Sequence, residues 1–73
     1  MERKLGAAVI GLGMMGERHA RIWAELPQTE LLAVYDIRPE PTAALAALYG
    51  IEPCDSIEAA LNTPGVDIVS VCT

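Results

Sequence analysis

Three glycines at a fixed spacing are the most chemically informative feature of the sequence. They lie in Gly11-Leu12-Gly13-Met14-Met15-Gly16, between an apolar run and a helical pattern. In such a turn the first glycine permits the sharp bend, the second lets the backbone approach a pyrophosphate, and the third lets a helix pack closely on a strand. Free N–H groups around Met14 and Met15 and the helix dipole favour two adjacent phosphates. The segment therefore predicts a phosphate-binding turn. A turn that serves packing alone is the alternative.

An acidic residue follows this turn at the distance expected for a ribose contact. Asp36 comes about 20 residues after Gly16, at the end of the apolar run 31–35. A carboxylate there hydrogen-bonds the adenosine ribose hydroxyls and repels a 2′-phosphate, so it indicates NAD. Ile37 and Arg38 follow in the same predicted cofactor site, with Arg38 placed to stack on adenine or partly accommodate the phosphate of NADP. The alternative is that Asp36 caps the next helix.

The other reactive side chains indicate binding rather than catalysis. His19, the single histidine, is expected to pack or hydrogen-bond within a helix. Cys54 and Cys72 do not have the spacing of a zinc pattern and are expected to be buried thiols, with a disulfide between them as the alternative. Cys72 and Thr73 end the last strand, where contact with the nicotinamide half of a cofactor is expected. Lys4, the only lysine, precedes the first strand, so no catalytic acid or base is predicted in this sequence. The methionine side chains of the glycine turn are expected to pack in the loop and core.

Short alternating elements must position these residues. The sequence predicts strands over 5–10, 31–35, 51–54 and 68–73 and helices over 14–26, 39–49 and 57–62. Gly50 is a plausible C-cap, Pro53 argues for an edge strand, and Asp55-Ser56-Ile57-Glu58 reads as a capping box that starts at Asp55. This order predicts an α/β fold, part of a doubly wound parallel sheet with about four strands and three helices. The fourth strand should lie beside the first and form a binding crevice there.

Composition narrows the class of protein. The chain has 73 residues, enough for one domain at most, and 52% of them are hydrophobic. Its net charge of −5 and its five Lys and Arg residues argue against a nucleic-acid partner. No apolar run has the length of a membrane span, and a cytoplasmic location is expected. An open sheet edge predicts low stability or self-association of residues 1–73 in isolation.

Three segments together resemble the N-terminal domain of the Gfo/Idh/MocA oxidoreductases. They are Val9–His19, which has the form G-x-G-x-x-G-x-x-H, Val34–Asp36, and Val66–Thr73, which has the form V-D-x-V-x-V-x-T. The resemblance covers nearly the whole sequence and implies a Rossmann domain. It also implies cofactor-binding roles for the glycine turn and Asp36, with Cys72 and Thr73 lining the nicotinamide ribose.

The resemblance also implies an activity for the parent protein. Members of this family move a hydride between nicotinamide and a hydroxyl-bearing carbon, usually of a sugar, polyol or related compound, and use a lysine from a Glu-Lys-Pro motif and often a later histidine. Residues 1–73 contain neither, so they are expected to be an inactive N-terminal part of the dinucleotide-binding domain, with the substrate domain absent. The parent is expected to be a homo-oligomer with a small-molecule substrate. A non-enzymatic NAD(H) sensor is the first alternative, and a flavin or S-adenosylmethionine domain is another.

Overall fold

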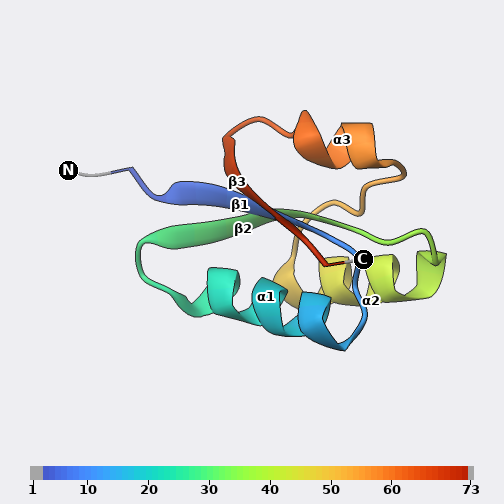
Figure 1. Ribbon diagram of the computed structural model, residues 1–73. Helices are drawn as coiled ribbons and strands as arrows, with labels where there is room; N and C mark the ends of the chain where they lie inside the picture. Colours follow the sequence, from blue (N-terminus) through green and yellow to red (C-terminus); the bar gives the residue numbers. More distant parts are fainter. Residues whose placement is uncertain (1–2, 73) are drawn as a thin grey trace.

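A computed structural model describes residues 3–72 as one layer of sheet between two layers of helix (Figure 1). In chain order the elements are β1 (Leu5–Ile10), α1 (Met14–Glu25), β2 (Thr29–Tyr35), α2 (Pro39–Tyr49), α3 (Ile57–Leu61) and β3 (Val66–Val71). None of the helices in this range has the length and apolar character that crossing a bilayer requires.

The sheet is parallel, with strand order β2-β1-β3. The central strand β1 is apolar on both faces because helices cover both, and all of its residues after Leu5 are buried. The last strand lies beside the first, as predicted, so the chain crosses from one side of β1 to the other between β2 and β3. The carboxyl ends of all three strands meet at one edge of the sheet, next to the start of α1.

The prediction of a strand over 51–54 is wrong, and the sheet has three strands in the described range instead of about four. The end of α2 explains the difference. Gly50 adopts a left-handed conformation, with φ of 67°, and the N–H of Ile51 donates to the carbonyl of Ala46 at 2.9 Å. That amide therefore closes the helix instead of joining a ladder, and Pro53 has no N–H to contribute.

The two faces of the sheet are packed differently. Helices α1 and α2 cover one face over a cluster of larger side chains, and α3 covers the other (Figure 1). Under α3 the buried residues are all alanines, namely Ala8, Ala33 and Ala60, with Cys54 half-buried against them. These small side chains allow the short helix α3 to lie close to the sheet. The opposite cluster comprises Val9, Leu12, Ala20, Leu31, Val34, Leu45 and Ala46.

Several element ends differ from the predicted ones. Both β2 and β3 begin two residues earlier, because Thr29 pairs with Leu5 and Val66 pairs with Gly6. Helix α3 is capped by Ser56, whose hydroxyl accepts from the N–H of Ala59 at 2.9 Å. The N-cap is therefore one residue later than the predicted Asp55. Because the third residue after Ser56 is Ala59 rather than Glu or Gln, the helix has a Ser cap without the reciprocal bond of a capping box.

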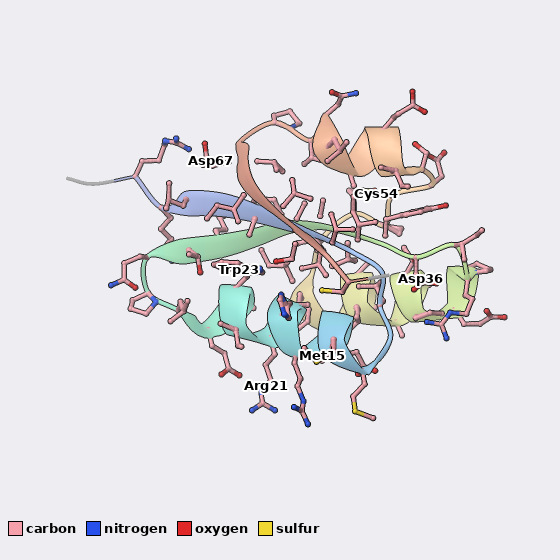
Figure 2. The ribbon with its side chains drawn as sticks, in the orientation of Figure 1. Met15, Arg21, Trp23, Asp36, Cys54 and Asp67 are labelled. Carbon is pink, nitrogen blue, oxygen red and sulfur yellow. The ribbon has the colours of Figure 1, made fainter. Side chains whose placement is uncertain are left out.

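Asp67 closes the end of the sheet opposite the glycine turn. Its carboxylate accepts from the backbone N–H of Gly6 at 2.9 Å and from both terminal nitrogens of Arg3, at 3.1 and 3.2 Å. Figure 2 shows Asp67 near the start of β1. The acidic residue of the V-D-x-V-x-V-x-T segment, Asp67, therefore has a structural role: it ties the start of β3 to the start of β1. Sequence reasoning missed it because the partners lie more than 60 residues away in the chain.

Candidate functional site

The three glycines of the turn meet three different steric requirements. Gly11 has a backbone φ of 92°, which residues other than glycine rarely adopt. A Cβ on Gly16 would overlap the carbonyl oxygen of Gly11 and lie 2.8 Å from its carbonyl carbon, so α1 packs directly on the end of β1. A Cβ on Gly13 would meet no atom within 4 Å. Gly13 is therefore unnecessary for packing and leaves open space beside the backbone.

The open space at Gly13 lies at the start of α1. Gly13 is the N-cap residue and no side chain caps the helix; the first intrahelical bond runs from the N–H of Glu17 to the carbonyl of Gly13. The N–H groups of Met14, Met15 and Gly16 thus precede the hydrogen-bonded part of the helix. Together with the positive end of the helix dipole, they offer donors to a phosphate group placed against Gly13.

Asp36 joins the end of β2 to the glycine turn. Its carboxylate is only 8% exposed, and Oδ2 accepts from the backbone N–H of Leu12 at 2.6 Å. The residue is not the N-cap of α2, which is Arg38 without a side-chain cap. Its backbone is fixed by Thr42, whose hydroxyl accepts from the N–H of Asp36 at 2.9 Å. The structure thus holds Asp36 beside the turn rather than at the helix start.

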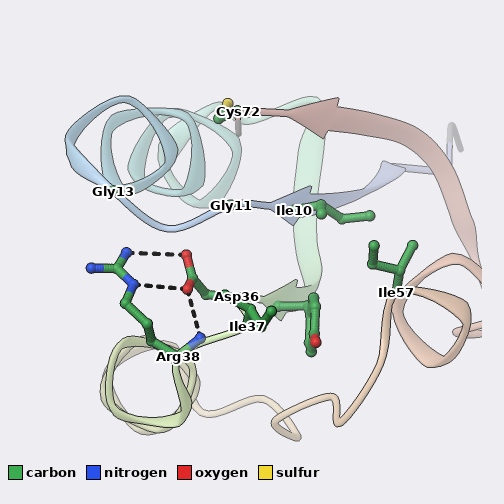
Figure 3. A pocket seen from close by; sticks show the side chains of 9 residues that line it. Ile10, Gly11, Gly13, Asp36, Ile37, Arg38, Ile57 and Cys72 are labelled. Atoms are coloured by element: carbon green, nitrogen blue, oxygen red, sulfur yellow. Dashed lines mark hydrogen bonds and ion pairs between the residues drawn. The ribbon is translucent and has the colours of Figure 1, made fainter.

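Arg38 occupies the remaining side of the same carboxylate (Figure 3). Its backbone N–H and its Nε donate to Oδ1 of Asp36 at 2.8 and 2.9 Å, and its Nη2 donates to Oδ2 at 3.1 Å. The Arg38 guanidinium, followed by the N–H groups of Leu12 and Arg38, holds the pKa of the Asp36 carboxyl well below its ordinary value of 3.8. Asp36 is therefore ionised throughout the physiological pH range.

This lowered pKa predicts acid sensitivity. A carboxyl whose pKa is lower when folded stabilises the fold above the unfolded pKa, and the stabilisation is lost as pH falls through the folded pKa. The pKa of Asp67 is lowered too, first by its bond to Arg3 and then by the N–H of Gly6. We expect the urea midpoint of the protein to fall from about pH 5 downward, and to fall less steeply in Asp36→Asn. Equal slopes in the two proteins would contradict a stabilising role for this carboxylate.

A cavity of about 500 Å³ lies at this edge of the sheet. Sequence reasoning predicted six of its residues and missed Ile10, Tyr35 and Ile57. Ile10 and Tyr35 are the last residues of β1 and β2, so their place at the ends of the predicted strands could have indicated them. Ile57, at the start of α3, comes from the opposite face of the sheet and shares the cavity with Ile37 (Figure 3). The full lining is Ile10, Gly11, Gly13, Tyr35, Asp36, Ile37, Arg38, Ile57 and Cys72.

The remaining predicted site residues lie in different surroundings. Leu12 is buried in the core and offers only its backbone N–H to the site. Met14 and Met15 are exposed, so the expected core packing of their side chains is wrong. Cys72 lines the cavity, and its N–H donates to the carbonyl of Ile10 at 2.8 Å. Thr73 lies outside the described residues.

The other reactive side chains do not gather into a second site. Cys54 and Cys72 are both free and half-buried, rather than buried as predicted. His19 is half-buried on α1, and Lys4 precedes β1, at the end of the sheet away from the cavity. Over residues 3–72, no three His, Cys, Asp or Glu side chains lie close enough together to hold a metal ion.

The sequence of residues 5–73 matches a family described as an oxidoreductase family with an NAD-binding Rossmann fold. The chain belongs to the Gfo/Idh/MocA oxidoreductase family. The resemblance drawn from its motifs is thereby confirmed, and so is the predicted fold class. As a member of this family, the chain is an NAD(P)-binding oxidoreductase domain. No curated protein sequence shows significant similarity to the chain.

Solved structures agree with the family. GenD2 from gentamicin A biosynthesis, in complex with NAD, is 33% identical and superposes over 100% of this chain with a TM-score of 0.89. UDP-N-acetylglucosamine 3-dehydrogenase from Acidithiobacillus ferrooxidans is 32% identical over 99% of the chain, with a TM-score of 0.83. A 3-ketoreductase from Actinomadura kijaniata, in complex with NADP, is 26% identical over 97%, with a TM-score of 0.83. The chain spans 21%, 22% and 23% of these proteins, respectively, or about a fifth of their length.

Proposed function

We propose that residues 1–73 form the N-terminal part of a dinucleotide-binding domain in an oxidoreductase that acts on a sugar, polyol or related small molecule. In this proposal the parent protein transfers a hydride between the nicotinamide and a hydroxyl-bearing carbon of its substrate. One observation carries the assignment of the binding site: Gly13, which packing does not require, opens onto the cavity that also contains Asp36.

In this proposal, different residues around the cavity bind different parts of the cofactor. The turn 11–16 and the free N–H groups of α1 receive the pyrophosphate, and Asp36 receives the adenosine ribose. In this assignment the apolar side chains of Ile37 and Ile57 flank the adenosine, and Cys72 is on the side of the nicotinamide ribose. The contact expected of Thr73 with the same ribose rests on the sequence alone. When bound, the nicotinamide supplies the hydride chemistry. The chain itself binds and orients it.

The substrate class rests on the family and on two similar proteins. One is named a dehydrogenase of UDP-N-acetylglucosamine, and the other a 3-ketoreductase. We assign no catalytic role to this chain, whose lysine and histidine, Lys4 and His19, both lie outside the cavity. We therefore assign proton transfer to residues of the parent protein outside 1–73, with a lysine in a Glu-Lys-Pro motif as the first candidate.

The binding groups of the cavity would serve a second candidate function equally, a non-enzymatic NAD(H) sensor. Titration of the full-length protein with NAD, NADP and FAD, followed by assays of nicotinamide reduction with sugars and polyols, distinguishes the two. Reduction with any of these substrates supports the enzyme. NAD binding without turnover, in a protein that lacks a Glu-Lys-Pro segment, supports the sensor. Preferential binding of FAD would overturn both.

Asp36→Ser should shift cofactor preference toward NADP. The change removes a negative charge that repels a 2′-phosphate and removes the acceptor for the ribose hydroxyls of NAD. Because a hydrogen bond to a charged group contributes about 1.5–3 kcal/mol, we expect the NADP-to-NAD affinity ratio to rise about tenfold or more. Isothermal titration of the full-length protein with each cofactor measures it. Asp55→Ser is the matched control, since Asp55 does not line this cavity. An unchanged ratio would remove Asp36 from the ribose site.

A further inference from the structure

The Asp36 carboxylate has no free acceptor position in this structure. Each of its oxygens accepts two hydrogen bonds: Oδ2 from the N–H of Leu12 and from Nη2 of Arg38, and Oδ1 from the N–H and from Nε of Arg38. An ionised carboxylate offers about four such positions in all. A ribose hydroxyl therefore cannot bond to Asp36 until one of the present donors leaves.

The four donors differ in how easily they leave. The N–H groups of Leu12 and Arg38 belong to the backbone, which the end of β1 and the Thr42 hydroxyl hold in place. The guanidinium is at the tip of a flexible side chain that is 58% exposed, against 8% for Asp36. An exposed arginine gains little net free energy from an ion pair because water and salt compete for it. The guanidinium is thus the donor that a ligand displaces.

Departure of the guanidinium would free one position on each oxygen. Nε bonds to Oδ1 and Nη2 bonds to Oδ2, so the fork covers the carboxylate edge that the backbone leaves open (Figure 3). A ribose presents two adjacent hydroxyls, the 2′ and the 3′, and each can donate one hydrogen bond. Two vacated acceptors side by side match this pair of donors in number and spacing. The backbone N–H groups would keep the carboxylate in position during the exchange.

We propose that Arg38 is an internal competitor for the ribose site, and that the adenosine diol of the cofactor binds Asp36 by replacing the Arg38 guanidinium. This inference rests on the proposed ribose role of Asp36. Arg38 then sets cofactor affinity through the fraction of molecules in which the carboxylate is open, because only that fraction binds. Removing the competitor raises the affinity for NAD without adding any contact to it.

The test is a double-mutant cycle on the full-length protein with NAD as the probe. Arg38→Ala is expected to lower the Kd for NAD about fivefold at low ionic strength, since an ion pair of this exposure closes most but not all of the molecules. In the Asp36→Ser background, Arg38→Ala should leave the Kd unchanged because nothing remains to compete for. Arg38→Lys, whose single ammonium cannot span both oxygens, should fall between wild type and Arg38→Ala.

Salt gives a readout that a structural role would not produce. The ratio of wild-type to Arg38→Ala Kd should approach one at about 1 M salt, where surface ion pairs are screened. Arg21→Ala is the matched control, because Arg21 pairs with Glu25 on the exposed side of α1, away from the cavity. An equal or weaker affinity of Arg38→Ala for NAD at low salt would overturn the inference. If Asp36→Ser also leaves NAD affinity unchanged, the ribose role of Asp36 fails with it; if Asp36→Ser weakens NAD binding, only the competition fails.

Discussion

Gly13→Val is expected to abolish NAD binding while leaving the fold intact. The isopropyl group would enter the open space beside Gly13, where we place the pyrophosphate. Loss of two charge-assisted hydrogen bonds between that group and the first turn of α1, at about 1.5 kcal/mol each, corresponds to an affinity loss of at least about a hundredfold. Titration calorimetry or the fluorescence of bound NADH measures the loss in the full-length protein.

Stability measurements separate this effect from misfolding. Gly13 has φ of −75°, which any residue adopts, and a Cβ there meets no neighbour within 4 Å. The free energy of unfolding should therefore fall by about 1 kcal/mol, the typical cost of an unfavourable residue at a helix N-cap. Ala44→Val, on the exposed side of α2, adds bulk away from the cavity and should leave NAD affinity unchanged. Wild-type affinity in Gly13→Val would place the pyrophosphate elsewhere.

Gly16→Ala should have the opposite signature, a large loss of stability. Its new methyl group would overlap the Gly11 carbonyl oxygen, and that oxygen belongs to backbone held by the turn rather than to a movable side chain. Overpacking of this kind costs about 1–3 kcal/mol, and we expect the upper end because α1 would have to move off β1. Chemical denaturation without cofactor measures the change, and NAD binding should weaken as the turn is displaced.

Gly13→Ala is the control for this second result, because it makes the same chemical change three residues earlier in open space. Its unfolding free energy should stay within about 1 kcal/mol of wild type. Equal stabilities of the Gly13→Ala and Gly16→Ala proteins would contradict the close contact between α1 and β1. Packing would then not distinguish the two glycines.

Local sequence was sufficient to predict most of the strands and helices. The apolar run before Gly11 predicted β1 with its observed bounds, and Pro39 with Gly50 predicted both ends of α2. Helix α1 was predicted to end at Leu26, one residue beyond its observed end at Glu25, and Leu26 is its C-cap. These features depend on residues a few positions apart, and hydrogen-bond closure and φ preferences act over that range.

Prediction failed where a group had two possible partners. The N–H of Ile51 could donate to a neighbouring strand or to the end of α2. It donates to the carbonyl of Ala46 in α2, which is already within reach. Asp55 and Ser56 both suit an N-cap, and the position of Ala59 selected Ser56. In each case the sequence indicates the possible hydrogen-bonding groups, but their positions in the folded chain decide which bond forms.

The sequence by itself determined the bounds of β1 and α2, the glycine turn and the carboxylate at the end of β2, because short-range geometry and residue type fix them. Only the tertiary structure decided what these groups contact. It brought Ile57 from the other face of the sheet into the cavity, tied Asp67 to Arg3, and filled every acceptor of Asp36 with Leu12 and Arg38. The first two contacts depend on how the strands pair and the helices pack, which brings distant residues together without leaving a local signal. The contact of Arg38 with Asp36 depends instead on side-chain conformations that the spacing of two residues does not specify.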